Sequence, residues 1–301
     1  AVFSAMGFAF SKVPPEIMQN MAKTALKTYI QNGYTTVQEG RADAGTSEMW
    51  RSFADIGQLP IDVVVYPDIM NEKAYMLKNG SSLNYQNHFR IGGVKISLDG
   101  SPQGKTAWLT KPYLIPPEGK AKHYRGYPAY PNIKTVQDAI NLAYQNHWQI
   151  LAHANGDAAI DQYIQTIESA NAQYGKQDRR NVIIHAQTMR EDQLDRAKDL
   201  GLIPSFFSLH TYYWGDWHKH ETLGAERANR ISPTGSALKR GMIFTEHHDA
   251  PVIPPKNMMV IDATVNRTTR SGDVLGEEQK VSPYIALKTV TDWAAYQYFE
   301  D

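Results

Sequence analysis

The sequence contains no cysteine among its 301 residues. Disulfide bonds are therefore excluded, and so are metal sites built from thiolates. Any metal held by this chain must be bound by histidine, aspartate, glutamate or a chemically modified lysine. The absence of thiols does not select a compartment, because it suits both the cytoplasm and the periplasm.

The sequence also lacks an excess of charge and a long apolar run. Lysine plus arginine and aspartate plus glutamate both number 31, so the formal net charge is zero. No basic stripe typical of nucleic-acid binding is present, and no apolar run approaches the ~18–20 residues that cross a bilayer. The opening AVFSAMGFAF lacks the basic region and cleavage site of a signal peptide. We expect neither nucleic acid nor a membrane as a partner.

What the sequence does contain is an alternation of short apolar runs with amphipathic, helix-like segments, a pattern typical of a parallel sheet covered by helices. Seven runs are predicted as strands, at residues 34–40, 61–67, 92–98, 148–154, 181–187, 202–210 and 241–248.

A closed (β/α)8 barrel has eight strands, and an open parallel sheet would expose two edges. We therefore expect an α/β fold that is an incomplete (β/α)8 barrel, with about seven of its eight strands, over residues 1–301. The first strand is expected to come from the rest of a longer protein, and a homo-oligomer is an open expectation.

Four chemically important side chains come at or near the ends of these runs: Lys95 in GGVKISLDGS, His153 in QILAHANGD, His185 in NVIIHAQ and Asp249 in FTEHHDAP. Active sites of such barrels lie at the C-terminal ends of the strands, so these side chains are expected to converge. Neutral imidazole and carboxylate are common metal ligands. Each residue also has an ordinary interpretation, as a core histidine or a turn aspartate.

Lys95 is the most unusual of the four, because an ammonium group inside an apolar strand is costly to bury. A lysine of lowered pKa can react with carbon dioxide to form a carbamate, which is an anionic bridging ligand. The alternative is a lysine that extends to the rim of the barrel and pairs with Asp99.

Further candidates for binding or catalysis lie in the loops. His210, at the end of the run from residue 202, is placed to hydrogen-bond a substrate or an oxyanion. One of His247 and His248 is expected to pack or to orient substrate, and we choose His248 as the substrate-binding candidate.

Arg267, together with Arg270, is a candidate for binding a substrate carboxylate, although an ordinary surface pair fits equally well. Tyr212 and Trp214 are candidates for an apolar substrate wall, or they pack the loop against the barrel. The tyrosine-rich segment 99–132 is expected to be an ordered loop that covers the substrate.

The stretches GGVKISLDGS, HANGDAAID, IIHAQ, HTYYWGDWH, DAPV, VNRTTRSGDVLG and SPYIALKTVT resemble the YtcJ-like branch of the amidohydrolase superfamily, known as amidohydrolase family 3. The resemblance implies a (β/α)8 barrel with one or two divalent metal ions, usually zinc. It implies that Lys95 is a carboxylated bridging ligand, that His153 and His185 bind the more exposed metal, and that Asp249 is both a ligand and the general base.

The chain departs from this family pattern in two ways. The family has a His-x-His pair on its first strand and a small β-domain built from both chain ends, and neither is found here. The segment His218-Lys219-His220 is predicted to lie in a polar loop and is a poor substitute for the pair. This chain alone is therefore expected to bind metal weakly.

The sequence thus predicts a metal-dependent hydrolase that uses a metal-activated water to cleave an amide or cyclic amide C–N bond in a small molecule. The same site could hydrolyse an ester or a lactone. A regulatory or binding protein that retains the barrel without turnover is the alternative from another class.

Overall fold

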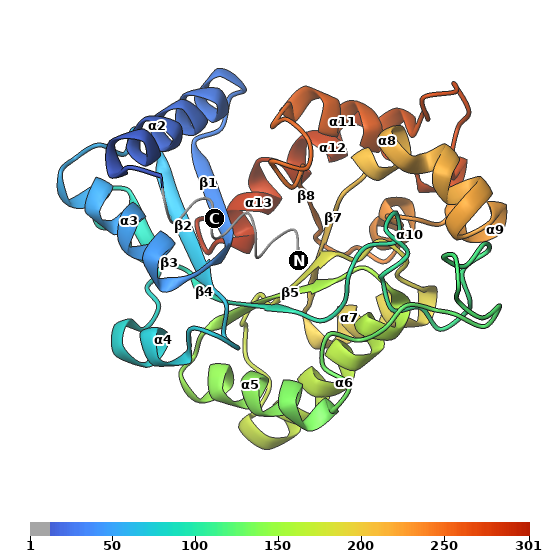
Figure 1. Cartoon of the computed structure of the whole chain (residues 1–301), viewed down its shortest axis with the longest axis horizontal. Coiled ribbons are helices and arrows are strands. Elements are labelled where there is room, and N and C mark those ends of the chain that lie inside the picture. The colour runs from blue at the N-terminus through green and yellow to red at the C-terminus, as the bar shows by residue number, and fades with distance from the viewer. Residues whose placement is uncertain (1–12) are drawn as a thin grey trace.

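All seven runs predicted as strands contain a strand in the computed structural model, which describes residues 13–301. The AVFSAMGFAF segment lies outside the described residues. Figure 1 shows the strands in the centre of the molecule with the helices arranged around them. The strands are β1 (Thr36–Ala42), β2 (Asp62–Pro67), β3 (Phe89–Ile91), β4 (Gly93–Ser97), β5 (Gln149–Ala154), β6 (Val182–His185), β7 (Ile203–Phe206) and β8 (Thr245–Glu246).

The strands form two parallel sheets, in the orders β1-β2-β3 and β4-β5-β6-β7-β8. Only Gly92 separates β3 from β4, and a β-carbon there would lie 2.6 Å from Val64 Cγ2. β2 pairs with β3, and Asp68, the residue that follows β2, forms a parallel bridge with Lys95 of β4. The two sheets are thus one bent layer, and its short member β3 was not predicted from the sequence.

The last two runs are shorter as strands than predicted. The run from residue 202 leaves the sheet after Phe206, and His210 lies in the first turn of helix α8 (Leu209–Trp217), not at a strand end. The physical reason is a local contact: buried Glu246 accepts hydrogen bonds from the backbone N–H of Ser208 (2.9 Å) and from its hydroxyl (2.5 Å). These bonds fix the residue that precedes the helix.

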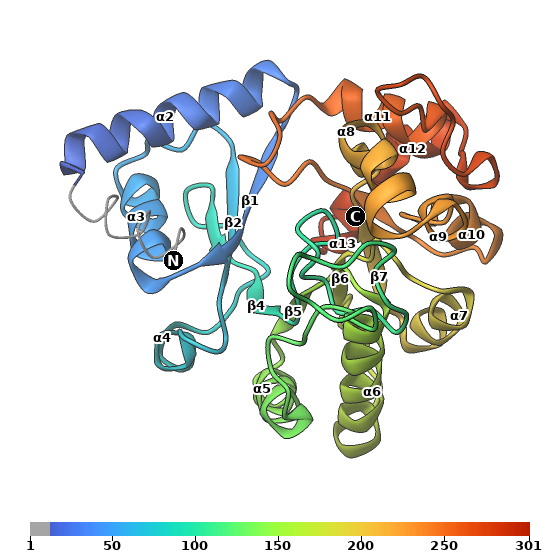
Figure 2. The same ribbon diagram turned by 45° about the vertical axis from the view of Figure 1, so that its right-hand side comes forward.

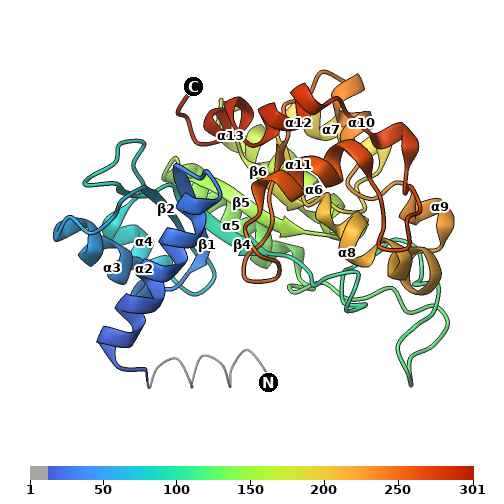
Figure 3. The same cartoon turned by 90° about the horizontal axis from the view of Figure 1, so that it is seen from above.

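The helices cover the outside of the strand layer, with amphipathic members such as α6 burying Ile160, Ile164 and Ile167. Figure 2 shows α5 and α6 side by side, and Figure 3 shows α2 beside β1 and β2, opposite α11 and α12. None of the helices within residues 13–301 is both long and apolar enough to cross a membrane.

The helices are α2 (Pro15–Gln31), α3 (Ala44–Asp55), α4 (Lys73–Asn79), α5 (Ile133–Gln145), α6 (Asp157–Tyr174), α7 (Glu191–Leu200), α8 (Leu209–Trp217), the π-helix η1 (His218–Thr222), α9 (Ala225–Ala228), α10 (Thr234–Lys239), α11 (Asn257–Asn266), the 3-10 helix η2 (Glu277–Gln279), α12 (Pro283–Thr289) and α13 (Asp292–Gln297).

The outer strands β1 and β8 are not hydrogen-bonded to each other within the described part of the chain. The C-terminal segment nevertheless contacts both: Tyr298 donates its hydroxyl to Gln38 of β1 (2.7 Å), and Thr245 of β8 donates to Gln297 (2.8 Å). Arg90 of β3 donates to the Tyr298 carbonyl (2.8 Å). These residues hold the two sheet edges at a fixed separation.

Candidate active site

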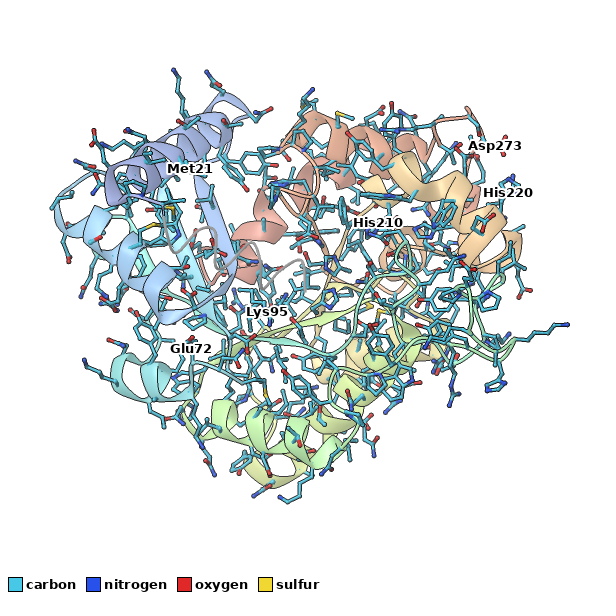
Figure 4. The ribbon with its side chains drawn as sticks, viewed as in Figure 1. Met21, Glu72, Lys95, His210, His220 and Asp273 are labelled. Carbon is cyan, nitrogen blue, oxygen red and sulfur yellow. The ribbon has the colours of Figure 1, made fainter. Side chains whose placement is uncertain are left out.

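The four residues predicted to converge lie at the C-terminal side of the strand layer. Lys95 is in β4, His153 is in β5, His185 ends β6, and Asp249 follows β8. The parallel register pairs Ser97 with His153 and Ala154 with His185. The rings of His153 and His185 meet edge to face with centroids 4.6 Å apart. Figure 4 shows Lys95 and His210 inside the ring of helices, whereas His220 and Asp273 lie at its periphery.

His247 joins this group, although His248 was the residue expected there. Its Nε2 lies 3.0 Å from Nδ1 of His185, and its Nδ1 lies 3.1 Å from the hydroxyl of Ser205. His248 packs instead against Tyr29 and Tyr34, each with a centroid separation of 5.5 Å. The substrate role predicted for His248 stays a prediction.

Burial sets the charge states of His153, His185, His247 and Lys95. It lowers the pKa of His153 and His185 well below the usual value, and it lowers that of His247 to about 3. These imidazoles are therefore neutral at pH 7 and have a lone pair available. Burial also lowers the pKa of Lys95 to about 8, against the opposing charge of Asp249.

The carboxylate of Asp249 belongs to the same electrostatic group. Although much of the residue is exposed, packing around the carboxylate raises its pKa, and the charge of Lys95 opposes that shift. The backbone of Asp249 has a positive φ of 56°, which is uncommon for a residue other than glycine.

Asp99 does not pair with Lys95, which corrects one interpretation of the sequence. Its buried carboxylate accepts backbone N–H groups from Trp108 (3.0 Å), Asn155 (3.0 Å) and Gly156 (2.8 Å). These bonds tie the start of the segment 99–132 to the turn after β5. Burial nevertheless raises the pKa of Asp99 to about 7.

The side chain of His153 is held from one side. Its Nε2 lies 3.1 Å from the amide nitrogen of Asn155, which also donates to the Gly100 carbonyl (2.9 Å). Its Nδ1 is buried and has no hydrogen-bond partner among residues 13–301, although Asp99 Oδ1 lies 3.5 Å away.

The segment 99–132 is an ordered loop without helices or strands. Leu109 donates its backbone N–H to Arg125 (2.8 Å), Tyr113 to Tyr124 (3.0 Å), and Leu114 to Thr222 in η1 (2.8 Å). It therefore docks on the region that follows β7.

His210 is buried and packs between other aromatic rings. Its ring centroid is 4.1 Å from that of Phe207 and 5.6 Å from that of Trp214, and its Nε2 lies 3.4 Å from Gln103 Nε2. Tyr212 packs edge to face on Tyr213, with centroids 5.1 Å apart. The half-exposed Trp214 thus lies beside His210, whereas Tyr212 is farther along α8.

Arg267 is removed from the substrate-binding candidates. Its side chain is fully buried, and its guanidinium donates to the carbonyls of Leu275 (2.7 Å), Ser232 (3.1 Å) and Ile231 (2.6 Å). Each of its three nitrogens thus donates to a backbone carbonyl of the protein itself. Arg267 therefore holds three loops together.

The prediction that residues 218–220 form a polar loop was wrong. These residues belong to the π-helix η1, and His218 is fully buried. Its Nδ1 lies 2.8 Å from the hydroxyl of Thr222, and its Nε2 lies 2.9 Å from the amide of Gln187. His218 is thereby engaged at both nitrogens and is not a free metal ligand.

Among the described residues, no three side chains of histidine, aspartate or glutamate are arranged to hold a metal ion. The donor types nevertheless suit a divalent metal, because His153 and His185 are neutral and Nδ1 of His153 is buried without a partner. The types of donor atom therefore fit a divalent metal, but these residues supply too few ligands to hold one by themselves.

Known proteins resemble the chain over only part of their own length. YtcJ of Bacillus subtilis, which carries an amidohydrolase name, is 24% identical over 214 residues, covering 69% of this chain and 38% of that protein. LONG AFTER FAR-RED 3 of Arabidopsis thaliana is 27% identical over 230 residues, covering 72% of this chain and 38% of that protein. The chain spans less than half the length of both.

Solved structures share the fold. A metal-dependent hydrolase of Pyrococcus horikoshii superposes with a TM-score of 0.77 at 24% identity, covering 92% of this chain and 55% of that one. Atrazine chlorohydrolase of Arthrobacter aurescens, solved with zinc, gives a TM-score of 0.61 at 13% identity over 99% of this chain and 63% of that one.

A sequence model described as the amidohydrolase family matches residues 1–301. That match extends over the whole chain and includes every strand that carries a candidate residue. The chain belongs to the amidohydrolase family.

Proposed function

We propose that this chain carries the larger part of a metal-dependent hydrolase site that cleaves an amide or cyclic amide C–N bond. The observation that carries the proposal is the grouping of Lys95, His153, His185 and Asp249 at one side of the strand layer, with both imidazoles neutral. The Pyrococcus and Arthrobacter structures are described as a metal-dependent hydrolase and as a zinc complex, which supports a divalent metal such as zinc here.

His153, His185 and Asp249 would hold the metal, together with Lys95 as a carbamate. A metal bound there lowers the pKa of water from ~15.7 towards ~7 and polarises a carbonyl group. The Lys95 pKa of about 8 supports carbamate formation, because the reactive form is the neutral amine.

Side chains of this chain would perform the remaining catalytic and substrate-binding roles. Asp249, which is partly exposed, would accept a proton from the attacking water and return it to the leaving amine. His210 would donate a hydrogen bond to the developing oxyanion after a small rearrangement of its buried ring. Trp214 would provide an apolar wall beside it.

The ligand set would be completed by a further strand between β8 and β1. This strand would close the barrel, and its side chains would enter beside His247 and Lys95. The segment that contains Gln297 and Tyr298 contacts both edge strands, and β1 and β8 are not hydrogen-bonded to each other among residues 13–301. Both observations support an additional strand between them. A longer form of this protein is the expected source of the strand.

The test is metal content per chain by elemental analysis, in bicarbonate buffer, for this chain and for a longer form. One or two equivalents of zinc in the longer form, lost in Lys95→Ala and His153→Ala variants, is the expected result. His147→Ala is the matched control, because His147 is exposed and lies two residues before β5, at the opposite end of that strand from His153. Unchanged metal in all variants would overturn the site, and no metal in either form would favour a non-catalytic binding protein.

Ester and lactone hydrolysis remain the alternative on the same site. Paired substrates that differ only in N–H against O at the scissile position separate the two activities. A higher kcat/KM for the amides supports the proposal.

A further inference from the structure

Arg41 is a charged residue of β1 that the roles above do not use. Its Nε donates to Oδ2 of Asp68 at 2.8 Å, and the Asp68 side chain is only 6% exposed, whereas that of Arg41 is 59% exposed. Neither Nη atom of Arg41 has a hydrogen-bond partner among residues 13–301. The Nε atom of Arg41 is therefore held by Asp68, whereas its two Nη atoms are free to bind another group.

The backbone at Arg41 is shaped to aim this side chain. Glu39 pairs with Val65 and Ala42 pairs with Pro67, so Gly40 and Arg41 together oppose a single residue of β2. This is a β-bulge, which redirects a side chain and is frequent beside active sites. The bulge lies at the C-terminal end of β1, the same side of the layer as the candidate active site.

Asp68 is itself fixed, so the anchor is rigid. Its Oδ1 accepts the backbone N–H of Met70 (2.9 Å), and its backbone forms the parallel bridge to Lys95. Arg41 is thus connected to the strand of Lys95 through Asp68, whose carboxylate accepts from Arg41 and whose backbone pairs with Lys95.

The charge of Arg41 reaches the candidate site. Burial is the main cause of the lowered pKa of His153 and Lys95, and the positive charge of Arg41 lowers both further. The same charge lowers the pKa of Tyr130, in the segment 99–132, against the stronger effect of burial. The charge of Arg41 thus acts on both the strand ends and this segment.

We propose that Arg41, anchored by Asp68, binds a carboxylate of the substrate through its free Nη atoms, so that the substrate is an amide bearing a carboxylate group. The free edge of a guanidinium matches the two oxygens of a carboxylate in a bidentate pair. Arg41 takes the carboxylate-binding role for which Arg267 was a candidate, because each nitrogen of Arg267 already donates to a backbone carbonyl. The substrate class rests on the proposed function, whereas the carboxylate site itself does not.

The first experiment measures binding without turnover. Benzoate and its neutral counterpart benzamide are titrated against the protein by saturation-transfer NMR. Benzoate is expected to bind the wild type more tightly than benzamide does, and Arg41→Met is expected to weaken benzoate about tenfold or more without affecting benzamide. Lys198→Met, which removes one exposed charge from α7, is the control and should leave both affinities unchanged.

Arg41→Lys covers the case in which the methionine variant fails to fold. It keeps the positive charge but loses the paired Nη donors, so an intermediate affinity for benzoate is expected. Equal benzoate affinity in wild type and either Arg41 variant, or no preference of the wild type for benzoate, would overturn the site.

The second experiment tests the substrate class on the longer, metal-loaded form. An N-acetylated amino acid and its primary amide are compared, and Arg41→Met should lower kcat/KM for the first only. Hydrolysis of both without preference overturns the substrate class while the hydrolase proposal stands. Hydrolysis of neither, with benzoate binding intact, counts against the hydrolase proposal and leaves the carboxylate site.

Discussion

Nε2 of His247, which follows β8, lies 3.0 Å from Nδ1 of His185 at the end of β6, and these two strands are not neighbours in the sheet. Both imidazoles are neutral, so one nitrogen of the pair carries the hydrogen and the other accepts it. Ser205, on the intervening strand β7, fixes the far side of the His247 ring. The contact therefore sets the orientation of His185 and leaves its Nε2 for another partner.

His247→Phe keeps a ring of similar volume and removes this hydrogen bond. We expect the metal affinity of the longer form to fall about 10- to 100-fold, the usual effect of losing a partner that orients a ligand. Competition with a chromogenic zinc chelator measures the change.

The neighbouring His248 provides the control, because it packs on Tyr29 and Tyr34 and does not contact His185. His248→Phe should leave zinc affinity within about twofold. If both variants lose zinc equally, His247 does not act through His185.

Lys95→Met is expected to stabilise the protein while abolishing its metal binding. Burial lowers the Lys95 pKa from 10.5 to about 8, so between these values the unfolded chain holds a proton that the folded chain does not. Stability therefore rises with pH across this window, and at pH 7 the buried ammonium lowers it by about 3 kcal/mol.

Urea unfolding in buffer free of carbon dioxide measures this effect. The methionine variant should gain up to about 3 kcal/mol at pH 7, and the gain should shrink towards pH 10.5. A variant less stable than wild type at pH 7 would show that the ammonium is well paired inside the protein.

His218 predicts a loss of stability in acid. Burial lowers its pKa from 6.5 to about 3, so below pH 6.5 the unfolded state takes up a proton that the folded state excludes. The stability contributed by neutral His218 is complete above pH 6.5 and is lost as the pH falls towards 3. At pH 4.5 the loss amounts to about 2–3 kcal/mol.

His218→Asn keeps a polar group between Thr222 and Gln187 and cannot titrate. The difference in unfolding free energy between pH 7 and pH 4.5 should be smaller in this variant by that amount. His220→Asn, at an exposed position of the same π-helix, should show the wild-type dependence. An unchanged dependence in His218→Asn would mean that His218 is protonated in the folded protein.

Local patterns predicted every strand except β3, because each of these is a short apolar run. They pointed to Lys95 as a charged residue inside such a run, and to His153 and His185 as residues at or near strand ends. Local patterns could not show which of His247 and His248 lies beside His185. β8 is only two residues long, which is too short to predict the side of the layer on which the following side chains lie. The bulge at Arg41 depends on the register between β1 and β2, which a single strand sequence does not contain.

Arg267 is the clearest example of a residue whose partners cannot be read from its local sequence, and its contacts give a testable prediction. Its three acceptors come from Ile231, Ser232 and Leu275, so no pattern near VNRTTRSG reveals that its donors are occupied. Arg267→Met would leave the buried carbonyls of Ile231 and Leu275 without a donor, whereas the Ser232 carbonyl keeps the backbone N–H of Thr234 (2.8 Å). Each unsatisfied group costs about 1–3 kcal/mol, so we expect the variant to lose at least about 2 kcal/mol of unfolding free energy.

Urea unfolding at pH 7 measures this loss, with Arg270→Met as the matched control. Arg270 is exposed and lies over the rings of Tyr212 and Tyr213, so its replacement should cost less than about 1 kcal/mol. A benzoate titration of Arg267→Met, under conditions in which it remains folded, should match the wild type. Weaker benzoate binding by this variant alone would return the carboxylate role to Arg267 and remove it from Arg41.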